Sequence, residues 1–264
     1  MIVKVLAKVD LTGNDLQIKL TSLYQQEKFK KIVKEMQEKE MFKVEELEVE
    51  KAYTFEAAVG QKAKGLIQFN STIINLVNKD KTVTILFNEL PIHQDHYFGQ
   101  VLQKGDSNNI VTFTFEQEEV IEKQYETNLV QFEFAEENIS IDNEVSLLAW
   151  WTSDGCLPGG YQHCGGNCGY GSTHGGGKPI NATDTCCVAH DRCYDVFGYG
   201  DNCCDKELVS CVSGHTTVAA AGIRAFFGPQ HYSVSSKEKA FEGMNPSKAF
   251  LDVFLNKITF NVNI

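Results

Sequence analysis

The spacing of apolar residues changes once within the first half of the chain. Between residues 16 and 36 they recur at broadly helical spacing, which predicts an amphipathic helix. From about Phe42 onward apolar positions alternate with polar ones, the pattern of a strand with one buried face. Polar segments at residues 78–81 and 104–109 predict turns between such strands. The strands expected after the first alternating segment are residues 66–77, 83–90, 97–103, 110–120 and 129–134.

These elements predict a chain of two domains. Residues 1–145 are expected to form an α+β domain whose strands make a mostly antiparallel meander around an apolar core. The acidic stretch 135–144 is a candidate linker, and Trp150 and Trp151 beyond it are expected to pack in a core rather than touch a lipid interface. Residues 146–264 hold every cysteine and are expected to form a small, disulfide-rich, mainly α domain.

All nine cysteines lie between Cys156 and Cys211, a density typical of disulfide-framed domains in oxidising compartments. The count is odd, so one thiol is left over or pairs with another chain. A zinc module is the alternative, but the neighbouring cysteines 186–187 and 203–204 would point about 100° apart on a helix, which suits two disulfides better than one metal. A secreted or extracellular protein is therefore expected. No signal peptide is visible, which fits either a trimmed chain or an unusual export route.

The charge of the chain argues against one class of partner. The formal net charge is −11, of which residues 1–150 carry −9 and residues 151–264 carry −2. No basic patch stands out, so no nucleic-acid partner is expected. His93 and His96 have the spacing of a metal-binding pair, but no third ligand lies nearby in the sequence, and a solvated loop is expected there. Nothing in residues 1–145 specifies a chemistry.

The chemistry is concentrated in residues 181–194, Asn-Ala-Thr-Asp-Thr-Cys-Cys-Val-Ala-His-Asp-Arg-Cys-Tyr. Asn181 suits a helix N-cap, and the expected helix runs from about residue 182 to 197. On this helix Cys186, His190 and Tyr194 share one face, and Asp191 lies on an adjoining face. A histidine beside an aspartate, held between crosslinked positions, suits acid–base and metal chemistry.

Two flanking segments complete the constellation. Residues 164–179 are rich in glycine, whose backbone lets carbonyl oxygens turn inward toward a hard cation such as Ca²⁺, with Asp191 as the carboxylate ligand. Such a loop alone is usually a flexible linker. Residues 203–211 predict a second helix, capped by Asp201 or Asn202 and antiparallel to the first. Disulfides between the helices would hold Asp205 near His190, where it fixes the imidazole tautomer; the alternative is that Asp205 only caps its helix.

These motifs resemble those of the secreted phospholipase A2 family. The segment Asp184-x-Cys-Cys-x-x-His-Asp-x-Cys-Tyr194 is similar to the family's active-site helix. Cys168-Gly-Tyr-Gly171 is similar to its calcium loop, of the bee-venom type, and Cys204-Asp-x5-Cys211 to its second catalytic helix. The resemblance covers roughly residues 160–213 and implies a phospholipase A2-like fold for residues 146–264, whereas residues 1–150 have no recognised counterpart.

The resemblance implies a role for each matching residue. His190 would be the general base and Asp205 its orienting partner, and the water they activate would attack the sn-2 ester of a glycerophospholipid at a membrane surface. The Gly169 N–H would help to stabilise the oxyanion. Calcium would be held by the carboxylate of Asp191 and by the backbone carbonyls of Asn167, Gly169 and Gly171.

The sequence also departs from the family's pattern. Asn167 stands where the family usually has Tyr or Trp, which a backbone ligand tolerates. The short turn between the two helices leaves no room for the β-wing of the pancreatic and venom enzymes, so its tyrosine contribution is missing or comes from Tyr194 or Tyr199. The implied disulfides are Cys168–Cys187, Cys186–Cys211 and Cys193–Cys204, with Cys156–Cys164 as a further pair and Cys203 left without a disulfide.

Other functions stay open at this point. A non-enzymatic toxin or bacteriocin could use the same crosslinked fold to bind a receptor or disrupt membranes, although the intact His190, Asp191 and Asp205 favour the enzyme. Residues 1–145 could be a prodomain or inhibitory cover that contacts the catalytic domain, or a targeting or receptor-binding domain. The apolar segments 218–227 and 250–255 are expected to be a third helix and core rather than an interfacial lipid surface.

Overall fold

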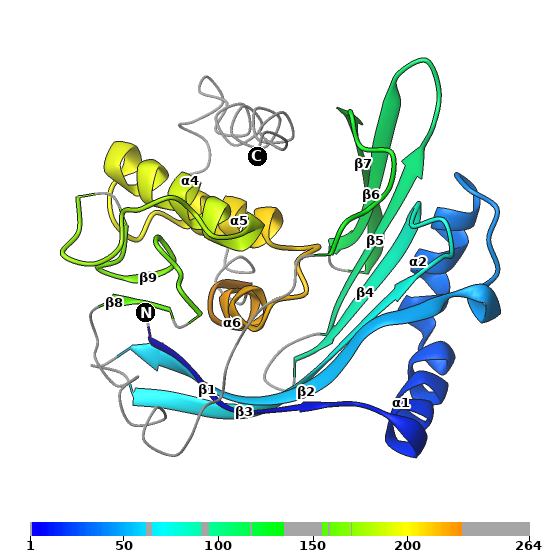
Figure 1. Ribbon diagram of the computed structural model, residues 1–264, viewed down its shortest axis with the longest axis horizontal. Coiled ribbons are helices and arrows are strands. Elements are labelled where there is room, and N and C mark those ends of the chain that lie inside the picture. The colour runs from blue at the N-terminus through cyan, green and yellow to red at the C-terminus, as the bar shows by residue number, and fades with distance from the viewer. Residues whose placement is uncertain are drawn as a thin grey trace. The chain divides into compact units, whose positions relative to one another are not determined.

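The computed structural model describes residues 2–61, 65–90, 95–116, 118–134, 155–157, 159–169 and 171–228 (Figure 1). The chain divides into two compact units. Ala7–Glu56 and Phe69–Ala135 form the sheet unit, and Met1–Leu6, Ala57–Gln68 and Glu136–Ile264 form the disulfide unit. The expected linker at 135–144 and the two tryptophans lie outside the described residues, so a domain boundary between residues 145 and 146 stays a prediction.

A seven-stranded sheet follows the order of the chain from β1 to β7. The described pairings from β3 to β7 are all antiparallel, which confirms the predicted meander. The predicted strands that correspond to β3, β4 and β5 are confirmed to within about one residue at each end. The strands are β1 Ile2–Asp10, β2 Glu48–Gln61, β3 Gly65–Val77, β4 Val83–Glu89, β5 His96–Gln103, β6 Asn108–Glu116 and β7 Glu119–Thr127.

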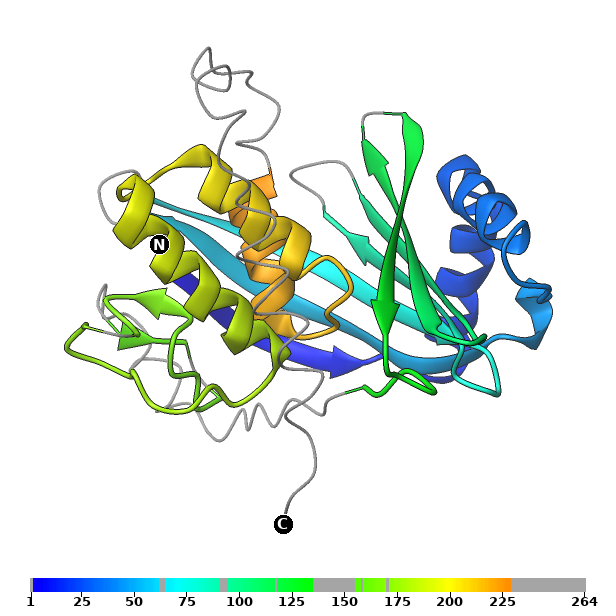
Figure 2. The same ribbon diagram turned by 90° about the horizontal axis from the view of Figure 1, so that it is seen from above.

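Two helices, α1 Gly13–Gln25 and α2 Glu27–Gln37, lie against one face of the sheet (Figure 2). The prediction of a single helix over residues 16–36 is wrong, because Gln26 between them is extended, with φ −70° and ψ 131°. The break changes the direction in which the apolar face points. In a continuous helix Tyr24 and Phe29 would lie on different faces. The core that the two helices share with the sheet includes Leu20, Leu23, Phe29, Ile32, Val33, Met36, Ile74, Ile85, Phe87, Val101, Val111 and Phe113.

Three strand predictions need correction. Val44–Glu46 forms a 3-10 turn, so β2 begins at Glu48 rather than near Phe42. The predicted strand 110–120 covers most of β6 and the start of β7. The predicted strand 129–134 is irregular backbone. Its apolar side chains still pack, because Leu129, Phe132 and Phe134 join a small cluster with Leu102 and Ile110.

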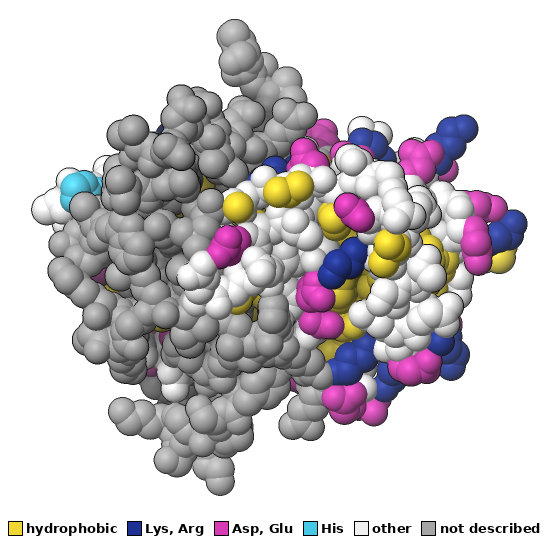
Figure 3. All heavy atoms as spheres, turned by 90° about the horizontal axis from the view of Figure 1, so that it is seen from below, with side chains coloured by type: hydrophobic (Ala, Val, Ile, Leu, Met, Phe, Trp, Pro, Cys, Tyr) yellow, Lys and Arg dark blue, Asp and Glu magenta, His cyan; other side chains and the backbone are white. Residues whose placement is uncertain are grey.

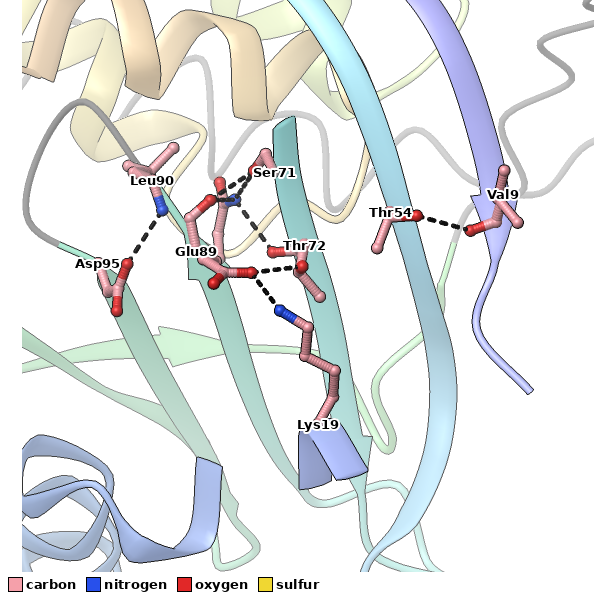
Figure 4. Close-up of polar contacts among 9 residues, drawn as sticks. Val9, Lys19, Thr54, Ser71, Thr72, Glu89, Leu90 and Asp95 are labelled. Carbon is pink, nitrogen blue, oxygen red and sulfur yellow. Dashed lines mark hydrogen bonds and ion pairs between the residues drawn. The ribbon is translucent and has the colours of Figure 1, made fainter. Parts of the chain in front are cut away.

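A polar cluster ties α1 to the sheet (Figure 4). Lys19 Nζ donates to Glu89 Oε2 at 2.7 Å, and Thr72 Oγ1 donates to the same oxygen at 2.5 Å. Burial raises the pKa of Glu89, but these two hydrogen bonds and the charge of Lys19 together hold the pKa below its ordinary value. The side chains of Lys19 and Glu89 are 36% and 39% exposed, so the ion pair contributes about 1 kcal/mol or less.

Charges on the described surface are mixed in sign. On the face that Figure 3 shows, basic and acidic side chains of the sheet unit are interspersed. Lysines of α2 and its C-terminal extension pair with glutamates of β7 and of the turn before it: Lys28 with Glu118, Lys31 with Glu119, and Lys39 with Glu122. Among the described residues, no helix has both the length and the apolar character needed to cross a bilayer.

The disulfide unit is built from short elements around a cysteine-rich core. A small hairpin of β8 Gly155–Cys156 and β9 Gly165–Gly166 precedes three helices, α4 Ala182–Phe197, α5 Asn202–Cys211 and α6 Val218–Phe227. The predicted helix 182–197 is confirmed. The segment 218–227 is a helix buried in the core, as expected, and residues 250–255 lie outside the described residues.

Candidate active site

Helices α4 and α5 form the frame of the site. Asn181 starts α4 by accepting a hydrogen bond from the Asp184 N–H at 2.9 Å. Asp201, rather than Asn202, starts α5 by accepting from the N–H groups of Cys203 and Cys204. The disulfides Cys186–Cys211 and Cys193–Cys204 join early residues of one helix to late residues of the other, so the helices run antiparallel.

Between these two disulfides the helices bring His190 and Asp205 together. His190 Nε2 lies 3.0 Å from Asp205 Oδ1, and both side chains are buried. An ionised carboxylate only accepts hydrogen bonds, so in a neutral imidazole Nε2 carries the proton and Nδ1 keeps a lone pair. Tyr194 also donates its hydroxyl to Asp205 Oδ1. Tyr194, one of the two tyrosines considered from the sequence, thus contacts this dyad, the pair His190 and Asp205.

Aromatic rings surround the dyad. The ring of Tyr194 lies 4.1 Å from that of His190, and Phe227 of α6 meets the same imidazole edge-on at 5.5 Å. Tyr199 packs on Tyr194 at 5.1 Å while itself remaining 89% exposed. Burial, and then the hydrogen bond to Asp205, raises the pKa of Tyr194 above its ordinary value. The Tyr194 hydroxyl therefore keeps its proton near neutral pH and remains a donor to the dyad.

Asp184 ties the start of α4 to the segment before the glycine-rich loop. Its carboxylate is fully buried and accepts four backbone N–H groups. Oδ1 accepts from His163 at 2.8 Å and Cys164 at 3.2 Å. Oδ2 accepts from Gln162 at 3.0 Å and Ile180 at 3.1 Å. One side chain thus fixes residues 162–164 against α4.

The glycine-rich loop contains the three residues expected to offer backbone oxygens to calcium. Asn167, Gly169 and Gly171 all have positive φ, at 53°, 123° and 79°. Glycine is favoured at such angles, and asparagine tolerates the first of them. Gly169 is hydrogen-bonded within the loop, since its N–H donates to His174 O at 2.9 Å and its carbonyl accepts from Ser172 at 3.1 Å. To act on an oxyanion, as the sequence led us to expect, the Gly169 N–H would have to leave His174.

Asp191 lies beside Gly169, as the sequence motif led us to expect. A Cβ built on Gly169 would lie 2.3 Å from Asp191 Oδ2, and this buried oxygen has no hydrogen-bond partner. Burial, and then the carboxylates of Asp195 and Asp184, raises the pKa of Asp191 to about 7. Such a carboxylate is costly to leave charged without a cation. The described residues hold no cluster of three or more His, Cys, Asp or Glu for a metal, so backbone oxygens would have to supply the other protein ligands.

Two of the implied disulfides are confirmed and two pairings are wrong. Cys186–Cys211 and Cys193–Cys204 form as expected. Cys187, however, pairs with Cys164 rather than Cys168, and Cys168 pairs with Cys156. The hydrogen bonds of Asp184 hold the backbone of Cys164 beside α4, within reach of Cys187. Cys203 remains a thiol, as expected.

His163 is a residue of the site that sequence reasoning missed. Its ring is buried, and Nε2 lies 2.8 Å from Gly177 O. Its Nδ1 is buried without a hydrogen-bond partner, near Gly169. A lone histidine before a cysteine gave no signal, because its position depends on contacts with the distant Asp184. His96, the expected loop histidine, begins β5, and His93 lies outside the described residues.

Comparison with known proteins identifies similar chains. An acidic phospholipase A2 of Gloydius halys is 30% identical over 104 residues, which cover 32% of this chain and 71% of that protein. Acidic phospholipase A2 Tgc-E6 of Trimeresurus gracilis is 31% identical over 106 residues, 33% of this chain and 65% of that protein. Basic phospholipase A2 PLA-N of Protobothrops flavoviridis is 34% identical over 97 residues, 37% of this chain and 56% of that protein. No family model and no solved structure matches the chain.

The fold and the site define a small, disulfide-crosslinked helical domain that carries a buried His–Asp pair beside a glycine-rich loop. Together with these relatives, it shows that the chain belongs to the phospholipase A2 family. The N-terminal part has no counterpart among the relatives, and the chain spans less than two thirds of the length of two of the three. The bee-venom type of calcium loop stays a prediction.

Proposed function

We propose that this chain hydrolyses the sn-2 ester of glycerophospholipids at a membrane surface and requires calcium. The observation that carries the proposal is the position of Asp191, a carboxylate with a buried, unpartnered oxygen, directly after the histidine of the dyad. Neighbouring residues of a helix point about 100° apart, so His190 and Asp191 serve two adjacent parts of one site. His190 would transfer the proton, and Asp191 would take part in charge stabilisation.

The residues around Asp191 fit calcium. Calcium takes carboxylate and carbonyl oxygens in flexible geometry. Asp191 would supply the charged ligand, and Asn167, Gly169 and Gly171 would supply backbone carbonyls from a loop whose positive φ angles suit such a turn. A cation there would satisfy the orphaned oxygen of Asp191. When bound, calcium would polarise the ester carbonyl and hold the substrate phosphate.

His190 acts as the base through Nδ1, because Nε2 faces Asp205. It removes a proton from the water that attacks the ester carbon and later gives that proton to the leaving alcohol. Asp205 stabilises the imidazolium that forms in between, and it holds the imidazole in the required tautomer. Tyr194 bonds the same oxygen of Asp205 and keeps the carboxylate oriented toward the ring.

The test is fatty-acid release from mixed phosphatidylcholine vesicles by the full chain, with calcium or with excess chelator. Calcium-dependent sn-2 release is expected, and His190→Gln should lower it by at least about 100-fold. Glutamine retains a donor that can reach Asp205, so the fold should persist. His174→Gln, which changes an exposed histidine of the loop, is the matched control and should hydrolyse at the normal rate.

We further propose that residues 1–145 are a prodomain or inhibitory cover of an extracellular enzyme. The acidic charge and the absence of cysteine in this part of the sequence, and the acidic stretch at 135–144, support it. A protease site placed in 135–144 of the full chain provides the test, and cutting should raise the rate of release. Equal rates before and after cutting would favour a targeting or receptor-binding role. No release in either state would favour the non-enzymatic toxin, which dye leakage from the vesicles would detect.

A further inference from the structure

Besides Asp191 Oδ2, a second buried atom without a hydrogen-bond partner lies near Gly169, the ring nitrogen Nδ1 of His163. A Cβ built on Gly169 would lie 3.3 Å from His163 Nδ1 and 2.3 Å from Asp191 Oδ2, so both atoms line the space that this glycine leaves open. Both are buried and have no hydrogen-bond partner. Among the described side chains only one other buried nitrogen or oxygen, Asn75 Nδ2 of the sheet unit, shares that condition. Two of the three buried side-chain atoms without a partner among the described residues thus lie next to the same glycine, Gly169.

The orientation of His163 is fixed from two sides. Its backbone N–H donates to Asp184 Oδ1 at 2.8 Å, and its ring Nε2 lies 2.8 Å from the carbonyl oxygen of Gly177. A carbonyl oxygen only accepts hydrogen bonds, so Nε2 carries the proton and Nδ1 of the neutral ring presents a lone pair. Turning the ring over or changing its tautomer would sacrifice the bond to Gly177. The lone pair is therefore held toward Gly169 and Asp191.

We infer that His163 Nδ1 and Asp191 Oδ2 form a binding site for a borderline divalent transition metal, represented by Zn²⁺, which competes with calcium for Asp191. An imidazole nitrogen with a carboxylate suits zinc, whereas calcium binds oxygen ligands and gains nothing from the nitrogen. Water or loop carbonyls complete the coordination. The inference concerns the metal site of the proposed function and rests on it, and it makes zinc an inhibitor of the calcium-dependent reaction.

Metal binding to the full chain tests this directly. Equilibrium dialysis with zinc chloride alone, with calcium chloride alone and with both should show zinc that is displaced by excess calcium. His163→Gln keeps a donor that can reach Gly177 O but removes the nitrogen ligand. It should weaken zinc binding by at least about tenfold, since even groups that only support a metal ligand contribute that much. Calcium affinity should hardly change, which also shows that the variant is folded.

Three further variants separate this site from other histidines and carboxylates. Asp191→Asn should lose both metals, whereas His174→Gln, in the exposed part of the loop, should bind zinc normally. His190→Gln should also retain zinc, because the dyad is not part of the site. Unchanged zinc binding by His163→Gln, or loss of zinc binding in His190→Gln, would overturn the inference. Fatty-acid release by the unaltered chain would be unaffected by either result. Loss of calcium binding and of hydrolysis in the unaltered chain would instead refute the proposed function.

Discussion

Asp184 offers the sharpest test of how this site is held together. Its two carboxylate oxygens accept four backbone N–H groups, two on each oxygen. In Asp184→Asn one of these positions becomes an NH₂ group, which cannot accept a hydrogen bond. Whichever way the amide turns, two of the four N–H groups then face a donor. The geometry of the side chain hardly changes, so the effect isolates these hydrogen bonds.

The size of the effect follows from the number of bonds lost. A hydrogen bond to a charged group contributes about 1.5–3 kcal/mol, so losing two should cost about 3 kcal/mol or more. About 1.4 kcal/mol corresponds to a factor of ten, so local opening of residues 162–164 should become at least about 100-fold more frequent. Hydrogen exchange at neutral pH, with the disulfides intact during labelling, should show this in peptides that cover residues 160–181.

Asp195→Asn is the matched control, because Asp195 lies on the same helix and is exposed. It removes the same charge but no described backbone hydrogen bond, and exchange in residues 160–181 should stay as in the unaltered chain. If the Asp184 and Asp195 variants exchanged at equal rates, the hydrogen bonds of Asp184 would not be what fixes this segment. The disulfides of the loop would then have to do so alone.

Three further predictions concern the dyad, the half-buried His215 and the sheet unit. Tyr194→Phe removes the hydroxyl that donates to the dyad and should slow fatty-acid release by about tenfold. Tyr199→Phe is the control and should leave the rate unchanged. Equal rates for the two variants would contradict the role of the Tyr194 hydroxyl. Burial lowers the pKa of His215 to about 4, below its value in the unfolded chain, so the unfolded chain binds more protons as pH falls from about 6.5 to 4. The free energy of unfolding should drop by about 1–2 kcal/mol from pH 7 to pH 5, and His215→Gln should remove that loss in urea titrations. Gly99→Ala would place a Cβ 2.3 Å from Met36 Sδ and should cost about 1 kcal/mol or more, seen as a lower melting temperature; an unchanged one would mean that the methionine yields freely.

The helices of the disulfide unit could be predicted because their starts are encoded locally. Asn181 and Asp201 each accept hydrogen bonds from N–H groups two or three residues later, so residue type and spacing suffice. The disulfide partners of Cys164 and of Cys168 could not be predicted in the same way. Both flank the same glycines, and the choice between them depends on a contact between Asp184 and residues some twenty positions away.

In the sheet unit the alternating strands were predictable, and two kinds of feature were not. The break at Gln26 replaces one helix with two, and no proline or glycine marks it in the sequence. Most of β7 was missed because its side chains are mainly polar and none is fully buried, so pairing with β6 defines it. Local patterns thus predict elements that bury one face, and they miss elements specified by backbone pairing or by a shift in packing.

The position of the dyad between two crosslinks has a consequence for recovery after heating. Cys186–Cys211 lies on one side of His190 and Asp205, and Cys193–Cys204 on the other. Even in a fully melted chain the two helix segments stay tethered at both ends, so the search that brings the pair back together is short. Heat should therefore inactivate the site reversibly under oxidising conditions. With a reductant present the same treatment should cause a lasting loss, because the tethers are gone when refolding begins.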